Sequence, residues 1–230
     1  MRGSYSLQQI DISFTSGENQ LSGIIVKPGT DKLSNAIVLV HGSGPVDRNS
    51  HGSFVALHER FARLGYAVLC YDKPGVGEST GDWRKQTFED RAQEVLSAIR
   101  FLKTHPLQIQ GVGLCGGSQA GWIMPIVAQL TEPVAFIISI SSAAVTVEEQ
   151  ERYRIERQLR GDHFSDEQVS QALSIYARRL DMIRQGAKAK QIATMQDSAM
   201  EEPWFPYLGD TTRRTSGFSS AYIDSTPSRY

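Results

Sequence analysis

The amino-acid sequence predicts an α/β protein with a doubly wound, mostly parallel sheet and a helical lid insertion. Short apolar runs, which are typical of strands buried on both faces, alternate with helical patterns as far as residue 140. From Val147 onward the patterns are helical and rich in charge, and no strand interrupts them. We therefore expect a core at residues 1–145, a lid at 146–208 and an irregular, Ser/Thr-rich tail at 209–230.

The first two strands are predicted to form a pair. Polar and apolar residues alternate in Gln9–Phe14, an apolar run fills Leu21–Val26, and Ser16-Gly-Glu-Asn19 supplies the turn between them. The next run, Ala36–Val40, is short, apolar and rich in β-branched residues, as expected of a central strand. Further strands of this kind are predicted at Tyr66–Tyr71, Gln110–Cys115 and Val134–Ile140.

Helices are predicted to connect these strands. Apolar residues with helical spacing in Phe54–Leu64 end before Gly65, which is a favoured residue just past a helix. The clearest apolar stripe runs through Thr87–Thr104, where Thr87 and Asp90 can cap the start of the helix. The other expected helices are Gln119–Leu130 in the core and Val147–Leu159, Ser165–Arg184 and Ala187–Met195 in the lid.

Composition limits the partners of this chain. Its fractions of hydrophobic and charged residues, 40% and 21%, are those of a soluble globular protein, and a formal net charge of −1 favours neither a nucleic acid nor a membrane as partner. The two cysteines, Cys70 and Cys115, end predicted buried strands and are expected to be reduced thiols. The first residues lack the apolar segment of a signal peptide, so we expect a cytoplasmic protein.

The stretch Gly113-Leu-Cys-Gly-Gly-Ser-Gln-Ala-Gly-Trp122 surrounds one hydroxyl with small residues. Gly116 and Ala120 flank Ser118 between a predicted strand and a predicted helix. The resulting G-x-S-x-A pattern is one step from the strained G-x-S-x-G turn that exposes a nucleophilic serine. An ordinary tight turn is the simpler alternative. The segment also matches G-x-G-x-x-G from Gly111, but its first two glycines fall inside the strand and no acidic residue stands about 20 positions beyond it. We therefore expect no cofactor, and no metal.

Two further loops follow predicted parallel strands: His41-Gly-Ser-Gly-Pro45 and Tyr71-Asp-Lys-Pro-Gly-Val-Gly-Glu-Ser79. Small residues in the first leave backbone N–H groups free to face an oxyanion, and both loops lie where open α/β sheets bind ligands. In this order the three loops resemble the α/β-hydrolase superfamily, above all its serine esterase, acyl-thioesterase and serine aminopeptidase-like branches. The resemblance extends over residues 8–145. A proline in the helix after the serine, here Pro125, is also a feature of that group.

The resemblance implies roles for individual residues. Ser118 would be the nucleophile, and the backbone N–H groups of Gln119 and Ser43 would stabilise the oxyanion. Asp72 looks similar to the aspartate that braces the following turn in these proteins, and His41 is expected to order its loop by hydrogen bonds. The substrate is expected to contact Gly42, Gly44 and Gly117 in the core and Tyr176 and Trp204 in the lid, where packing onto the core is the alternative role for the last two.

The acid and the histidine of a catalytic triad are not found. In this superfamily the acid and the histidine both follow the serine, on loops after later strands. The only histidine after Ser118 in this sequence is His163, which falls in the predicted lid. Asp210 and Asp224 have no strand before them. We interpret the sequence as a hydrolase cut short or frame-shifted, with a true short paralogue as the alternative.

These features together predict a serine hydrolase that cleaves carboxylic esters or related acyl substrates through an acyl-enzyme on Ser118. Thioesters and aminoacyl compounds stay open as substrates, and turnover is expected to be weak without the rest of the triad. The alternative is a non-catalytic binding or interaction protein of the same fold. Without a seventh strand, Val134–Ile140 would be an uncovered apolar edge, through which we expect self-association.

Overall fold

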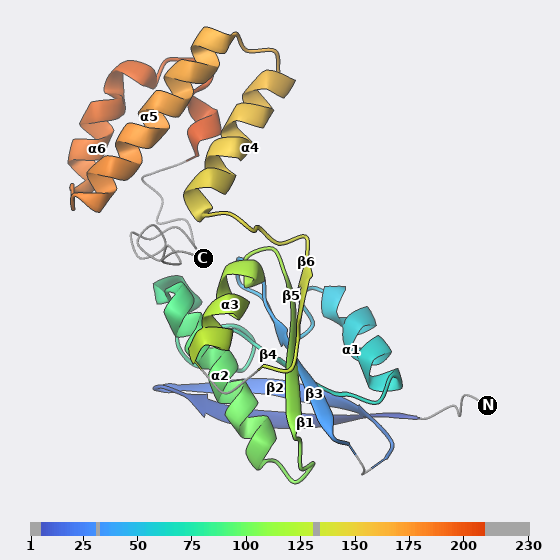
Figure 1. The fold of residues 1–230 in the computed structure, drawn as a ribbon. Coiled ribbons are helices and arrows are strands. Elements are labelled where there is room, and N and C mark those ends of the chain that lie inside the picture. The colour runs from blue at the N-terminus through green and yellow to red at the C-terminus, as the bar shows by residue number, and fades with distance from the viewer. Residues whose placement is uncertain (1–5, 31–32, 131–133, 210–230) are drawn as a thin grey trace. The chain divides into compact units, whose positions relative to one another are not determined.

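The chain divides into two compact units, Met1–Ala144 and Val145–Tyr230 (Figure 1). The computed structural model describes residues 6–30, 33–130 and 134–209. Of the predicted tail, residues 210–230 lie outside the described residues. The first unit contains the sheet, and the described part of the second unit is helical.

The described residues of the first unit form a six-stranded sheet in the order β1-β2-β4-β3-β5-β6. β1 and β2 form an antiparallel hairpin, β2 pairs antiparallel with β4, and the strands from β4 to β6 are parallel neighbours. The strands are β1 Leu7–Ser16, β2 Asn19–Pro28, β3 Asn35–Val40, β4 Ala67–Tyr71, β5 Gly111–Gly117 and β6 Ile137–Ile140. This confirms the predicted α/β class.

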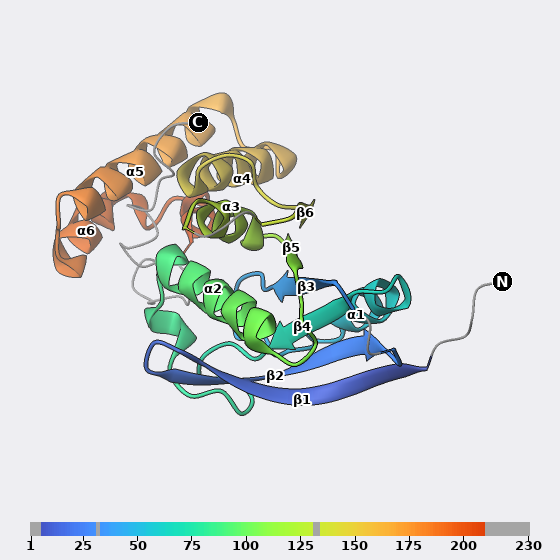
Figure 2. The same cartoon turned by 60° about the horizontal axis from the view of Figure 1, so that its bottom comes forward.

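Helices cover both faces of the sheet (Figures 1 and 2). α1 (Ser53–Arg63) covers one face, where Ile37 and Leu39 of β3 belong to the same hydrophobic cluster as α1 residues. α2 (Phe88–Thr104) and α3 (Ala120–Leu130) pack together on the other face. The alternating side chains of the central strands therefore have a helix to pack against on either side, which explains why these strands are apolar throughout.

The start of α2 confirms the predicted cap. The Thr87 hydroxyl accepts a hydrogen bond from the Asp90 backbone N–H at 3.0 Å, and the Asp90 carboxylate accepts one from the Thr87 N–H at 2.9 Å. This reciprocal capping box satisfies two N–H groups that the helix cannot. A short 3-10 turn, η1 (Trp83–Lys85), precedes it.

The strand bounds differ from the prediction at both ends of the sheet. β1 and β2 are longer than predicted, because their antiparallel register continues to the Ser16–Asn19 turn. β6 is shorter and begins at Ile137, three residues after the predicted Val134. Among the described strands it pairs only with β5, and Ile137 and Ile140 are each 41% exposed. An exposed apolar edge is thus present, and self-association through it stays a prediction.

The described part of the second unit contains α4 (Val147–Gly161), α5 (Asp166–Arg184), α6 (Ala189–Gln196), η2 (Asp197–Ala199) and η3 (Phe205–Leu208). Its core is its own cluster of buried residues, among them Ile155, Leu159, Val169, Tyr176, Leu180 and Trp204. Tyr176 and Trp204 are 8% and 2% exposed, so both contribute to packing within this unit. Their expected part in substrate binding stays a prediction. No helix among the described residues is long and apolar enough to cross a membrane.

Candidate functional site

The turn between β5 and α3 holds Ser118 in a strained backbone conformation. The φ angle of Ser118 is 54°, in the left-handed region that residues other than glycine rarely adopt. The Gly121 N–H donates to the Ser118 carbonyl oxygen at 3.0 Å, which starts the first turn of α3, and Ser118 itself is exposed. This is the strand–turn–helix context that the G-x-S-x-A pattern predicted.

Small residues allow this turn to pack against its surroundings. A Cβ atom at Gly116 would lie 2.5 Å from the Ala120 Cβ and 2.6 Å from the Val40 carbonyl oxygen. A Cβ atom at Gly121 would overlap the Ser142 Cβ. Because real Cβ atoms do not approach other atoms so closely, larger residues at either position would push α3 away from the sheet.

The loop after β3 lies beside Ser118. β3 and β5 are parallel neighbours with Val40 opposite Gly116, so the residues that follow these two strands meet at one edge of the sheet. A Cβ atom at Gly42 would lie 3.6 Å from the Ser118 Cβ and 3.5 Å from the Gly117 carbonyl oxygen. The structure therefore brings together Gly42, Gly117 and Ser118, as the loop order predicted.

Two backbone N–H groups of these loops, those of Ser43 and Gln119, donate to no other described residue. Ser43 is exposed, and the following Gly44 has a φ of 84°, which is far easier for glycine than for other residues. The Gln119 side chain is buried and accepts a hydrogen bond from the Arg91 guanidinium. Free N–H groups next to an exposed serine are the arrangement that stabilises an oxyanion.

Three buried ionisable side chains lie near one another behind the site, and two of them, Lys73 and Arg91, contact the loop after β3. Sequence analysis did not single them out. Lys73, Arg91 and Glu94 are each 3% exposed or less. Burial, together with the nearby Arg91 charge, lowers the pKa of Lys73 to about 6. Burial raises the pKa of Glu94 to about 7, although the Arg91 charge opposes this. In the sequence, Arg91 and Glu94 are indistinguishable from the polar face of a helix. Only the position of Lys73, in the loop after a predicted strand, could have pointed to a part in the site.

Within the described residues of the first unit, no histidine is hydrogen-bonded to the Ser118 hydroxyl. All five histidines of the chain belong to the described residues. His58 is buried on α1, and His105 ends α2 before β5 begins, at the opposite edge of the sheet. His163 belongs to the helical unit.

His41 orders its loop by packing. The ring is fully buried, with centroids 4.8 Å from that of Tyr71 and 5.5 Å from that of Phe54. The pKa of His41 lies well below its usual range. Burial is the largest cause, followed by the nearby charges of Lys73 and Arg91. The backbone near the ring opposes this shift, but neither ring nitrogen forms a hydrogen bond of ordinary geometry with a described residue. The backbone of Tyr71 and Asp47 lies near enough to the ring to raise its pKa, so the expected hydrogen bonds of this side chain are weak ones.

Asp72 braces the turn after β4, as the resemblance implied. The Arg48 Nη2 lies 2.6 Å from Asp72 Oδ2, and the Arg48 backbone N–H donates to Oδ1 at 2.6 Å. The Glu78 N–H lies 3.5 Å from Oδ2 on the other side of the turn, and a Cβ atom at Gly77 would overlap the carboxylate. Asp72 and Arg48 therefore connect the two loops that follow β3 and β4.

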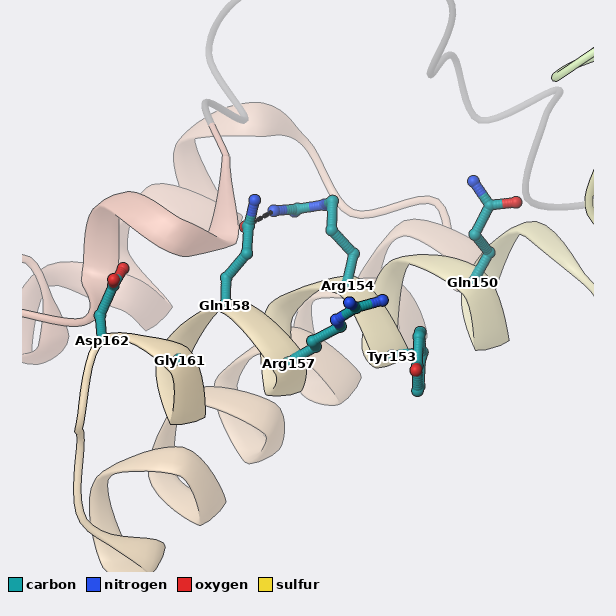
Figure 3. A pocket seen from close by; sticks show the side chains of 7 residues that line it. All are labelled: Gln150, Tyr153, Arg154, Arg157, Gln158, Gly161 and Asp162. Atoms are coloured by element: carbon teal, nitrogen blue, oxygen red, sulfur yellow. Dashed lines mark hydrogen bonds between the residues drawn. The ribbon is translucent and has the colours of Figure 1, made fainter. Parts of the chain in front are cut away.

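A pocket of about 500 Å³ runs along α4 in the helical unit (Figure 3). It is lined by Gln150, Tyr153, Arg154, Arg157, Gln158, Gly161 and Asp162. Arg154 Nη1 donates to Gln158 Oε1 at 2.6 Å across it. None of these residues was predicted to act in catalysis. Within the described ranges no cluster of three or more His, Cys, Asp or Glu side chains could hold a metal ion.

Comparison with known proteins gives a family match over most of the chain. The family of X-Pro dipeptidyl-peptidases (S15 family) matches residues 17–217, a range that includes Ser118 and all three loops. Among curated proteins, the quorum-quenching protein AidA of Acinetobacter baumannii (strain MDR-ZJ06) is 30% identical over 115 residues. The alignment covers 47% of this chain and 37% of AidA, so the chain matches little more than a third of that relative.

Solved structures share the fold. An esterase of Pyrococcus furiosus has a TM-score of 0.55 at 16% identity, over 69% of this chain and 59% of the esterase. The α/β hydrolase GrgF of a Penicillium species has a TM-score of 0.52 at 20% identity, over 67% and 53%. Est1E of Butyrivibrio proteoclasticus, solved with ferulic acid bound, has a TM-score of 0.53 at 21% identity, over 62% and 56%. The chain thus spans between 53% and 59% of the length of these structures.

Proposed function

This chain belongs to the X-Pro dipeptidyl-peptidase (S15) family and has the α/β-hydrolase fold, and on that premise we propose that it is a serine hydrolase of carboxylic acyl substrates. The observation that carries the proposal is the position of Ser118. Its hydroxyl is exposed on a left-handed turn, and two backbone N–H groups without an acceptor among the described residues belong to the adjoining loops. An ordinary tight turn would need neither the strain nor the free donors.

The proposed reaction proceeds through an acyl-enzyme. The Ser118 Oγ attacks the carbonyl carbon of the substrate, and the N–H groups of Ser43 and Gln119 stabilise the negative oxygen of the tetrahedral intermediate. The leaving group departs with the proton that the serine gives up, and an ester forms between the acyl group and Ser118. A water molecule then hydrolyses this ester, releases the carboxylic acid and restores the hydroxyl.

Esters are the substrate class that we propose. No histidine of the first unit is hydrogen-bonded to Ser118 within the described residues, and an amine leaves a tetrahedral intermediate only when it is protonated. A phenol or an alcohol of low pKa can leave as its anion and therefore depends less on a proton donor. The matched family is that of X-Pro dipeptidyl-peptidases, and one structural neighbour is an esterase of Pyrococcus furiosus, so aminoacyl and ester substrates are the two to compare.

The lack of a histidine partner for Ser118 among the described residues of the first unit favours one alternative function. A serine without a histidine partner is also what a non-catalytic binding protein of this fold would contain. The proposal predicts slow turnover in place of none, because an oxyanion hole and substrate binding alone retain a small part of the catalysis when triad members are lost. We expect rates well below the range of about 1–10³ s⁻¹ that is ordinary for enzymes.

Labelling with a fluorophosphonate, followed by mass-spectrometric mapping, tests the nucleophile. We expect the wild-type chain to be labelled at Ser118 and Ser118→Ala to remain unlabelled. Ser43→Ala is the matched control, because it removes an exposed hydroxyl but retains the backbone N–H that the mechanism uses. Labelling of Ser118→Ala at another residue would contradict the assignment.

A substrate panel tests the reaction. p-Nitrophenyl butyrate, butyryl-CoA and Ala-Pro-p-nitroanilide should be hydrolysed in that order of decreasing rate, and the hydrolysis should disappear in Ser118→Ala. If the anilide is cleaved fastest, the ester preference is wrong. If nothing is cleaved and Ser118 does not react, the binding protein is the better description.

A further inference from the structure

We propose that the buried side chains of Lys73 and Arg91 are positioning residues that aim the oxyanion-stabilising N–H groups of this site. The inference rests on the proposed function of Ser118. It concerns the interior side of the loop His41–Gly44, where no substrate can reach. Both side chains act on the backbone of that loop, so neither needs to touch the substrate.

Lys73 and Arg91 hold three carbonyl oxygens of this loop. Lys73 Nζ donates to the Gly42 oxygen at 2.6 Å and to the Gly44 oxygen at 2.8 Å. Arg91 Nη2 donates to the His41 oxygen at 2.9 Å, and its Nη1 lies 3.3 Å from the Gly42 oxygen. The Gly42 carbonyl therefore receives hydrogen bonds from both side chains, which fixes the orientation of its peptide plane.

The orientation of that plane decides where the Ser43 N–H points. The described residues contain no cis peptide bond, and in a trans peptide the N–H is directed opposite to the carbonyl oxygen. Because the Gly42 oxygen faces the buried amine of Lys73, the Ser43 N–H faces the exposed side of the loop. Gly42 also borders Ser118, so this is the side on which a substrate carbonyl would meet the serine.

Arg91 connects this donor with the second one. Its Nη1 also donates to the Gln119 side-chain oxygen, and the Gln119 backbone supplies the other proposed N–H. One guanidinium group thus binds the loop after β3 and the turn after β5. The fork of parallel donors that a guanidinium carries suits this task, whereas a single ammonium group could not span both loops.

Packing alone does not account for two neighbouring buried basic side chains, the Lys73 amine and the Arg91 guanidinium. Replacing buried charged groups by apolar side chains of similar volume is often neutral or stabilising, so retaining them has another reason. At neutral pH a lysine whose pKa is about 6 is an amine with two N–H groups, one for each of the two carbonyls that it binds. The Trp83 ring also lies near this amine, with its centroid 5.7 Å from Lys73 Nζ.

Lys73→Met tests the proposal, and Lys27→Met is its matched control. Lys27 is also buried and donates to two backbone carbonyls, at 3.3 Å to Pro28 and 3.1 Å to Thr30, but these belong to the end of β2 and the residues after it. We expect Lys73→Met to slow fluorophosphonate labelling of Ser118 by about 10- to 100-fold, since loss of one oxyanion donor has effects of this order and larger. In ester hydrolysis kcat should fall while KM changes little. Lys27→Met should keep the wild-type values.

Crystal structures of both variants provide a readout that does not depend on reactivity. In Lys73→Met the Gly42–Ser43 peptide should rotate or lose its single orientation, and in Lys27→Met it should not. A retained peptide orientation with unchanged labelling in Lys73→Met overturns the proposal, and so does an equal loss of labelling in both variants. If wild-type Ser118 is inert but the peptide rotates in Lys73→Met, the proposed function fails and the positioning role stands. If Lys73→Met does not fold, Arg91→Lys, which cannot span both loops, is judged by the same outcomes.

Discussion

Gly77 shows how closely the backbone approaches the buried Asp72 carboxylate. Its φ of 56° is left-handed, and a Cβ atom there would overlap Asp72 Oδ2, which Arg48 binds. We expect Gly77→Ala to lower the free energy of unfolding by about 1–2 kcal/mol through backbone strain. A further loss of about 1–3 kcal/mol should come from displacing the buried carboxylate from its hydrogen bonds with the half-buried Arg48.

Gly17→Ala is the control for this substitution. Gly17 has a φ of 58° with no atom within 4 Å of an added Cβ, so it carries the same backbone strain without the overlap. Urea unfolding of both variants measures the difference. An equal loss in the two would mean that Asp72 moves aside freely.

The lowered pKa of Lys73 predicts a pH dependence of stability. The groups that act on it are Arg91 and Glu94 from α2, and Lys73 in turn acts on His41. Between pH 7 and 9 the folded state leaves the amine neutral, whereas the unfolded chain, with a pKa of 10.5, binds a proton. Because the unfolded state binds more protons in this window, stability rises with pH, by about 1 kcal/mol per pH unit.

Denaturant unfolding from pH 7 to 9 checks this linkage. The wild type and Lys27→Met, which retains Lys73, should gain stability together, and Lys73→Met should lack that gain. A parallel pH dependence in all three proteins would show that Lys73 is charged in the folded state.

At the scale of the elements, the sheet ends in an exposed strand. β6 presents Ile137 and Ile140 and, within the described residues, pairs on one side only. Such an edge is a template for pairing between chains, and a charged residue opposes it. We expect concentration-dependent association of the chain in light scattering, and Ile137→Lys should reduce it.

Val55→Lys is the control for the edge. Val55 is a comparably exposed apolar residue, 38% accessible, but it lies on α1 away from any strand edge. Val55→Lys adds the same charge as Ile137→Lys. Because it does so away from β6, we expect the association to stay as in the wild type. A wild-type chain that stays monomeric at every concentration would mean that another part of the chain covers β6.

At the scale of the whole molecule, two units have separate cores. Trp204 is 2% exposed in the cluster of the helical unit and is the largest of its buried side chains. Trp204→Ala should destabilise this unit by about 3–5 kcal/mol, as large-to-small changes of buried aromatic residues do. Calorimetry should show an earlier transition for the helical unit, and fluorophosphonate should still label Ser118 at the wild-type rate. A loss of labelling would instead make Trp204 part of the site, as the sequence first suggested.

Local patterns were enough for most elements of the fold. Alternation and the turn at Ser16–Asn19 predicted the hairpin, and the Thr87 and Asp90 pair predicted the start of α2, because these features depend on residues close in sequence. β6 was predicted too long, since the extent of an edge strand depends on how far its single neighbour β5 pairs with it. Tertiary pairing sets that length, and no local pattern contains it.

The sequence by itself determined the α/β class, the order of the loops and the serine turn, because small residues around Ser118 are required wherever that turn forms. Only the tertiary structure decided what lies behind the site. Lys73 and Arg91 are 18 residues apart and bind the same carbonyl of Gly42, which neither periodicity nor spacing indicates. The sequence also could not tell that Trp204 packs within the helical unit. The hydrophobic pattern of a sequence indicates which residues are buried. Which buried residues contact one another depends on how distant segments pack in the folded chain.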